Sequence, residues 1–163
     1  KSGYSGAGRS IHNKYKNKNL YESLSAYGIR FHRHNPEIQQ MLEKYTRGKI
    51  QFNFTPHLSP MFRGILSTIY IDLKKGVNKK KITNTLINFY KKNFFVKVFK
   101  DSTLLSTNDV INTNYCYISV HNSKYQNKLI LLSAIDNLIK GGAGQAIQNL
   151  NIKYDFPIKT GLV

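Results

Sequence analysis

Two histidines and an arginine stand next to one another at His32, Arg33 and His34, just before a proline and a glutamate. Imidazole can take up or release a proton near neutral pH, and guanidinium binds carboxylate or phosphate through paired hydrogen bonds. In an extended segment the two histidines would point to one side and Arg33 to the other. We therefore expect either His32 or His34 to be an acid–base group, with a solvated basic loop as the alternative.

Three further side chains could meet an anion. Arg9 follows closely spaced glycines, and His57 and Arg63 lie in a connection that two prolines interrupt. Each lies beside a turn or an expected helix end, where backbone N–H groups also favour anions. Together with Arg33, these residues are candidate contacts for a small phosphorylated or carboxylated substrate.

The segment KGGAGQ at 140–145 places three glycines in what the apolar spacing predicts to be a helix over 134–150. Each glycine costs a helix about 1 kcal/mol relative to alanine, so we expect another group to approach this backbone closely. The segment lacks the preceding strand and the following Gly-Lys-Ser/Thr of a phosphate-binding loop. Close packing within the fold and contact with a cofactor or another domain are the two alternatives.

Cys116 is the single cysteine, which excludes an internal disulfide and agrees with a reducing compartment. A cytoplasmic location follows, or an organellar stroma or matrix in a eukaryote. Cys116 shares a predicted strand face with Ile118 and Val120, so we expect a small core residue rather than a nucleophile. No cysteine, histidine and carboxylate side chains have convincing metal-ligand spacing, so we expect no metal.

The formal charge of +17 in a chain of 163 residues raises the possibility of a nucleic-acid-binding module. The excess consists mostly of scattered lysine, alongside abundant asparagine, which indicates compositional drift on tolerant surfaces. A nucleic-acid platform would interleave exposed aromatic and basic residues, whereas Phe89, Tyr90 and Phe94 fall mostly on predicted core faces. Nucleic-acid binding is thus the less favoured function, and the longest apolar runs are too short for a membrane span.

Hydrophobic periodicity predicts an α+β fold in one domain, 1–163, with a mixed, largely antiparallel sheet and about three helices packed on it. Asn35 is a candidate N-cap for the first helix, and Phe89 is expected to face inward from the second. The polar stretch 13–19 is expected to be an exposed loop. The expected helices span 34–48, 78–93 and 134–150, and the expected strands span 51–58, 64–73, 94–99, 114–120 and 128–134.

Four segments in order resemble one family: SGYSGAGR, AYGIRFHRHNPEI, FTPHLSPMFRGIL and AIDNLIKGGAGQAIQNLN. They are similar to the second half of the N-acetyl-gamma-glutamyl-phosphate reductases. The resemblance implies the C-terminal domain of the glyceraldehyde-3-phosphate-dehydrogenase-like or semialdehyde-dehydrogenase type. Tyr4 and Asn35 depart from the family pattern, but neither is a proposed chemical group.

The resemblance also implies a reaction. A cysteine thiolate of a preceding nucleotide-binding domain attacks N-acetyl-gamma-glutamyl phosphate and releases phosphate. NADPH then reduces the thioester to N-acetyl-glutamate semialdehyde, a step of arginine biosynthesis. His32 or His34 would handle protons and hold the thiolate, and the fragment without the other domain would be inactive.

The resemblance further implies partners for this domain. The final helix, 134–150, would return to the nucleotide domain, with Asn137, Gly141, Gly142 and Gly144 on the side of the NADPH cofactor. The sheet would form the subunit interface of a homodimer or homotetramer. A sister acyl-phosphate reductase, such as the aminoadipate enzyme of lysine biosynthesis, is the alternative with the same fold and chemistry.

Overall fold

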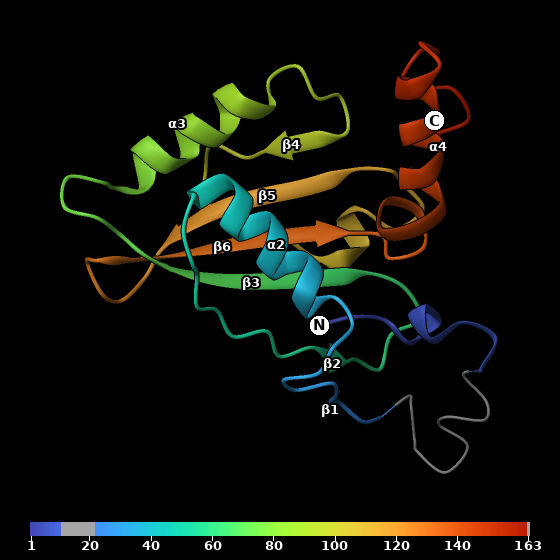
Figure 1. Ribbon diagram of the computed structural model, residues 1–163, viewed down its shortest axis with the longest axis horizontal. Coiled ribbons are helices and arrows are strands. Elements are labelled where there is room, and N and C mark those ends of the chain that lie inside the picture. The colour runs from blue at the N-terminus through green and yellow to red at the C-terminus, as the bar shows by residue number, and fades with distance from the viewer. Residues whose placement is uncertain (11–21, 163) are drawn as a thin grey trace.

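A computed structural model describes residues 1–10 and 22–162, so the loop expected at 13–19 lies outside the described residues. Helices and strands are interspersed along the chain without regular alternation, as expected for an α+β fold (Figure 1). The helical elements are η1 (Tyr4–Ser10), α2 (Asn35–Thr46), α3 (Lys79–Tyr90), η2 (Thr107–Asp109), η3 (Ile139–Ala143) and α4 (Gly144–Lys153). The strands are β1 (Ser25–Ala26), β2 (His57–Leu58), β3 (Ile65–Asp72), β4 (Val96–Val98), β5 (Cys116–Asn122) and β6 (Lys128–Ile135).

The main sheet has four strands in the order β3-β6-β5-β4. β6 pairs antiparallel with both β3 and β5, while β4 pairs parallel with β5. α3 lies between β3 and β4 in the chain, so a helical crossover joins the two edges of the sheet. A separate two-stranded ribbon is made by β1 and β2. The mixed, largely antiparallel sheet predicted from the sequence is confirmed.

α3 packs on one face of the sheet, which we call the helix face. Ile87 and Tyr90 of α3 line one hollow together with Val96 and Val98 of β4. Val120 belongs to the same face by strand register and is almost fully buried. Asn78 caps the helix, since its side chain accepts a hydrogen bond from the N–H of Lys81 at 3.0 Å. The expected inward position of Phe89 is wrong, because 71% of that residue is exposed.

The opposite face of the sheet is covered only in part. Leu105 and Val110, on either side of η2, pack against Ala134 in a buried cluster. Partly buried apolar side chains surround this cluster: Leu66, Phe99, Tyr115, Tyr117 and Leu132. Farther along the same face Tyr70 is 73% exposed. The opposite face therefore combines a small core at one end with open apolar surface at the other.

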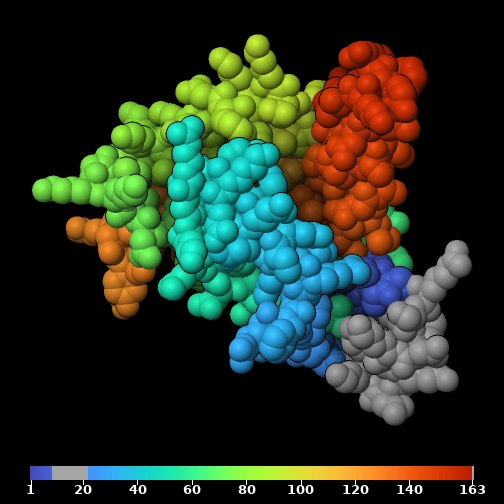
Figure 2. All heavy atoms as spheres, viewed as in Figure 1, coloured from blue at the N-terminus to red at the C-terminus, as the bar shows by residue number. Residues whose placement is uncertain are grey.

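Helix α2 forms where it was predicted but packs little within this chain. Pro36 occupies its first turn and Arg47 ends it in the left-handed conformation, with φ of 54°. The N-cap is His34 rather than Asn35, and it makes no side-chain capping bond. No residue of α2 is buried, and Met41 and Tyr45 are 47% and 74% exposed. Figure 2 shows α2 standing out on the viewed face of the molecule.

The strand expected at 51–58 is wrong over most of its length, because only His57–Leu58 finds a pairing partner, the two-residue β1. The bounds expected for the final helix, 134–150, are wrong as well. Ala134 still pairs in β6, and a turn and the π-helical η3 follow before α4 begins at Gly144. Gly142, with φ −152° and ψ −115°, breaks the helix inside η3. The glycines therefore mark a helix start and its break rather than a helix interior.

Within residues 1–10 and 22–162, every helix falls short of the length and apolar character that crossing a bilayer requires.

Close packing explains why the KGGAGQ segment has a glycine at position 144. It is buried, and an added Cβ would lie 2.5 Å from Asn114 Oδ1 and 2.8 Å from the Ile139 carbonyl oxygen. Contacts that short do not occur without movement of the backbone. The packing alternative is therefore supported for Gly144.

We expect Gly144→Ala to lower the free energy of unfolding by about 1–3 kcal/mol, because overpacking outweighs the helix preference of alanine. Urea unfolding followed by circular dichroism measures this change. Gly141→Ala is the matched control, since an added Cβ there meets first the movable Cδ1 of Ile135, at 3.3 Å. Equal stability of the two variants would contradict the packing role of Gly144.

Candidate functional site

The first residues of the chain run along the connection that carries His57 and Arg63. Backbone N–H groups of Ser2 and Gly3 donate to the carbonyl oxygens of His57 and Gly64, both at 2.8 Å. Gly3 is needed for this approach, because an added Cβ would lie 2.5 Å from the Phe62 carbonyl oxygen. Two of the segments that resemble the reductase family, SGYSGAGR and FTPHLSPMFRGIL, are thus held side by side.

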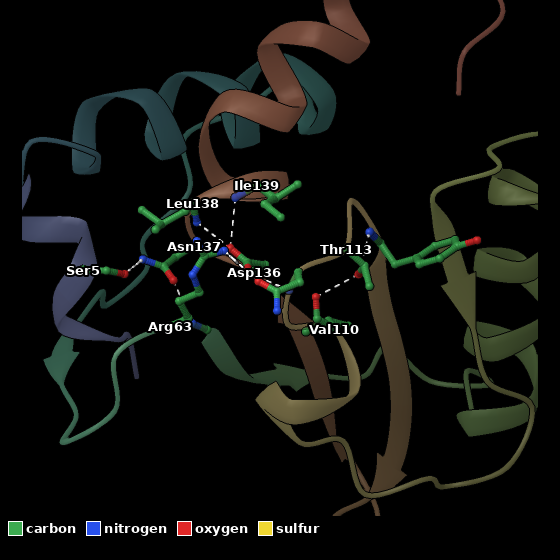
Figure 3. A network of polar contacts seen from close by, with 11 residues as sticks. Ser5, Arg63, Val110, Thr113, Asp136, Asn137, Leu138 and Ile139 are labelled. Atoms are coloured by element: carbon green, nitrogen blue, oxygen red, sulfur yellow. Dashed lines mark hydrogen bonds and ion pairs between the residues drawn. The ribbon is translucent and has the colours of Figure 1, made fainter. Parts of the chain in front are cut away.

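Asp136 lies at the end of β6 and is fully buried. Its Oδ1 accepts the N–H groups of Leu138 and Ile139 at 2.7 and 3.0 Å. Its Oδ2 accepts the Asn112 N–H at 2.9 Å and Arg63 Nη1 at 3.2 Å (Figure 3). Burial alone would raise the pKa of Asp136, but the backbone and Arg63 hydrogen bonds outweigh it and lower the pKa. The carboxylate therefore stays charged at neutral pH.

Asn137, beside Asp136, joins three of the segments. Its Oδ1 accepts the Gly64 N–H at 2.7 Å, and its Nδ2 donates to Ser5 Oγ at 2.9 Å (Figure 3). Asn137 is 9% exposed. Because the amide nitrogen carries two hydrogens, one remains beyond the bond to Ser5. The predicted contact of Asn137 with the cofactor stays a prediction. Asn137 would make it through this second amide hydrogen.

The histidine segment is a turn rather than extended backbone. The His32 ring lies 4.8 Å from that of His34, 5.2 Å from Phe54 and 5.4 Å from Tyr27, measured between ring centroids. His32 Nδ1 accepts the His34 N–H at 3.2 Å. In the neutral ring the proton therefore belongs on Nε2. Burial, and then the charges of His34 and Arg33, lower the pKa of His32.

Backbone contacts connect the rings of Tyr27, His32, His34 and Phe54, which we call the histidine cluster, to the segment that carries His57. The Tyr27 N–H donates to the Pro56 carbonyl oxygen at 3.1 Å, and Ala26 pairs with His57 between β1 and β2. The His57 ring is itself engaged, with Nδ1 3.0 Å from the Thr55 carbonyl oxygen. The connection between β1 and α2, which carries the histidine cluster, thus lies near the N-terminal segment (Figure 1).

The predicted site residues fall into distinct groups. Arg63 and Asn137 belong to one polar network, and His32 and His34 to one aromatic cluster. Gly141 and Gly142 are exposed beside the network, whereas Gly144 is packed inside. Arg33 is exposed, and none of the hydrogen bonds or ion pairs of the described residues involves its side chain. The Arg9 side chain lies outside the described residues, so its predicted role stays a prediction.

Sequence reasoning missed Asp136, Asn112 and Ser5 as parts of the site. Asp136 alone left a signal, because an aspartate directly after an apolar strand must either reach solvent or find several donors. Among the described residues no three histidine, cysteine or carboxylate side chains gather as metal ligands would.

The fold assigns the chain to a structural class, and sequence comparison then shows the family. Aspartate semialdehyde dehydrogenase II from Vibrio cholerae has the same fold, with a TM-score of 0.67, 14% identity and coverage of 93% of this chain and 52% of that chain. A probable aspartate-semialdehyde dehydrogenase from Pseudomonas aeruginosa has a TM-score of 0.68 at 14% identity, covering 94% of this chain and 53% of that chain. The class is therefore the second-domain fold of semialdehyde dehydrogenases.

Residues 1–137 match the semialdehyde dehydrogenase dimerisation domain, and the chain belongs to that family. It is 46% identical to an N-acetyl-gamma-glutamyl-phosphate reductase of Thermoanaerobacter pseudethanolicus, over 99% of this chain and 47% of the relative. It is 44% identical to a probable chloroplastic N-acetyl-gamma-glutamyl-phosphate reductase of Arabidopsis thaliana, over 100% of this chain and 41% of the relative. The chain spans less than half the length of these two curated relatives.

We expect the imidazole of His32 to titrate below its ordinary pKa of 6.5, because burial and two neighbouring cations disfavour its charged form. His34→Asn should raise the pKa of His32 by removing one of those cations. A pH titration of the histidine ring signals by NMR measures both. His121→Asn, on β5, is the control and should leave the His32 curve unchanged; an unshifted His32 in the His34 variant would contradict the charge coupling.

Proposed function

We propose that this chain supplies the second domain of an N-acetyl-gamma-glutamyl-phosphate reductase. The whole enzyme would reduce N-acetyl-gamma-glutamyl phosphate to the semialdehyde with NADPH and release phosphate. The observation that carries the proposal is 46% identity to such a reductase over 99% of this chain. The meeting of three of the shared segments at Asn137 supports it, because one amide then connects them.

The acid–base group of the proposed reaction is His32. Aromatic contacts and the bond from the His34 N–H hold its ring, while His34 is exposed. Its lowered pKa favours the neutral ring at pH 7, with an N–H at Nε2. That N–H can donate to the thiolate of the other domain, or to the developing oxyanion of the substrate. The other domain would supply the nucleophilic cysteine, and Cys116 on β5 is not that residue.

The cofactor side of the domain is the turn between β6 and α4. When bound, NADPH supplies the hydride for the reduction. Asn137 offers its second amide hydrogen, and the exposed backbone of Gly141 and Gly142 lets a cofactor or a domain come close. Gly144 is left out of this role, because its missing side chain is explained by packing.

The final helix supports contact with a further domain. α4 and the residues after it expose large apolar side chains, which a monomeric protein seldom gathers in one region. The exposed residues are Ile147, Leu150, Ile152, Tyr154 and Phe156. A preceding nucleotide-binding domain that returns to α4 would cover them, as the sequence resemblance implies.

The substrate is an acyl phosphate with a carboxylate, so its contacts are cationic. Arg63 lies in the network with Asp136 and is the best placed candidate. Arg33 is exposed beside His32, and Arg9 and His57 complete the predicted set. The aminoadipate enzyme remains the second candidate, since the same chemistry would serve a substrate one methylene longer. The predicted cytoplasmic or organellar location stays a prediction.

We expect the full-length protein to reduce N-acetyl-gamma-glutamyl phosphate with NADPH, and His32→Asn to lower kcat by about 100-fold or more, because a positioned proton donor is lost. His34→Asn should lower kcat less. Spectrophotometric NADPH oxidation measures both. Turnover by the 163-residue chain alone, or a higher kcat/KM for the aminoadipate analogue, would contradict the proposal.

The chain also forms the interface between two copies of the enzyme, as the name of its family suggests. The opposite face of the sheet fits this role, because Tyr70 is 73% exposed there and Leu104, beside the same face, is 82% exposed. On the helix face, α3 packs against β4 and β5 instead. If the opposite face of one copy met that of a second copy, these side chains would be buried in a homodimer. A second contact, between dimers, would make a tetramer.

We expect Tyr70→Lys to weaken the dimer at least about tenfold, because a large aromatic side chain is lost from the proposed interface and a charge is buried there. Sedimentation velocity at several protein concentrations measures the dimer dissociation constant. Phe89→Lys is the matched control, since Phe89 is 71% exposed but lies on α3, across the sheet. A weaker dimer in the Phe89 variant and an unchanged one in the Tyr70 variant would place the interface elsewhere.

A further inference from the structure

Among the described residues, the guanidinium of Arg63 is held through one nitrogen. Its Nη1 donates to Asp136 Oδ2 at 3.2 Å and to Asn112 Oδ1 at 3.1 Å. Among the described residues, no hydrogen-bond partner is found for Nη2 or Nε. The Arg63 side chain is 28% exposed, whereas that of Asp136 is fully buried. One nitrogen of the fork is therefore fixed inside the protein, and two remain open.

The Asp136 carboxylate cannot turn to follow the arginine. Three backbone N–H groups hold it, from Asn112, Leu138 and Ile139. Two of them bind Oδ1, and the third binds the same Oδ2 that meets Arg63. The carboxylate thus has a fixed direction, and Arg63 takes its orientation from it.

The geometry differs from that of an ion pair that serves stability alone. Arginine and carboxylate pair most strongly when two N–H groups meet two oxygens. Here one Nη1 is shared between two acceptors, and the backbone occupies the other carboxylate oxygen. The ion pair therefore leaves Nε and Nη2 of Arg63 available for two hydrogen bonds to another partner.

We infer that Asp136 is a positioning residue, which holds Arg63 so that Nε and Nη2 bind an anionic group of the substrate. The group is the phosphate or the carboxylate, since both match the planar fork. Gly64, the next residue, is bonded to Asn137, so the anion would lie beside the segment that faces the cofactor. This inference rests on the proposed function.

The test uses the full-length enzyme in the reverse direction, where N-acetyl-glutamate semialdehyde, NADP⁺ and inorganic phosphate are varied separately. Asp136→Asn keeps an oxygen for Leu138 and Ile139 but can place an NH2 group against Arg63 Nη1. We expect the KM for one of the two anionic substrates to rise about tenfold or more, with kcat changed less than about threefold, because a charged hydrogen bond is weakened in binding.

A double variant separates positioning from general damage. Arg63→Met should raise the same KM at least as much as Asp136→Asn. The double variant Arg63→Met, Asp136→Asn should raise it no further, because Asp136 acts through Arg63. Asp109→Asn is the matched control, since that exposed carboxylate caps η2 through Ser106 and lies outside the network. Its kinetic constants should equal those of the wild type.

The outcomes are distinct. A raised KM for phosphate assigns Arg63 to the phosphate, and a raised KM for the semialdehyde assigns it to the carboxylate. A fall in kcat with both KM values unchanged, or additive effects in the double variant, would overturn the inference. If Asp136→Asn does not fold, Arg63→Lys replaces it, because a single ammonium can still meet Asp136 but offers no planar fork to the anion. It should raise the same KM, and an unchanged KM would overturn the inference.

Failure of the proposed function gives a different result. A full-length wild type that binds NADPH but turns over no acyl phosphate would exclude the reductase. The inference is then judged by binding alone, with inorganic phosphate and N-acetyl-glutamate titrated against wild type and Asp136→Asn by calorimetry. Weaker binding of one anion to the variant would support the positioning of Arg63, and equal binding would overturn it.

Discussion

The buried carboxylate of Asp136 determines how the end of the sheet is built. A charge without solvent is costly unless several donors meet it, and here three backbone N–H groups and Arg63 do so. Two of those groups belong to the turn after β6, so the carboxylate ends the strand and starts the π-helical η3. The position of α4 follows from that turn. One interaction therefore links the sheet, the glycine-rich segment and the cation that we assign to the substrate.

The remaining surface of the chain suits a part of a larger assembly. Few large apolar side chains are fully buried, while α2, α4 and the opposite face of the sheet expose many. Exposed apolar surface on this scale usually meets another protein. A preceding nucleotide domain over α4 and a second copy over the sheet would account for two of these surfaces. The proposed function would explain the incomplete burial, because it places the site across a domain boundary.

Periodic segments were predicted well, because a strand or helix with one buried face repeats that face in the sequence. β3, β5, β6 and α3 each begin and end within a few residues of the expected bounds. The expectation failed at 51–58, where alternation was present but only His57–Leu58 found a pairing strand. The expected start of the final helix at Ala134 was also wrong, because Ala134 still pairs in β6. An apolar residue next to a helical pattern does not show whether the strand continues.

By itself the sequence determined which chemical groups are available: the His32 and His34 pair, the cation Arg63, and the glycines that permit close approach. It also determined the order of strands and helices, since these depend on neighbours along the chain. Only the tertiary structure decided which groups meet. Arg63 and Asp136 are 73 residues apart, and Ser5 and Asn137 are 132 residues apart. No local pattern encodes such contacts, because they exist only once the pairing of the strands has brought distant backbone segments together.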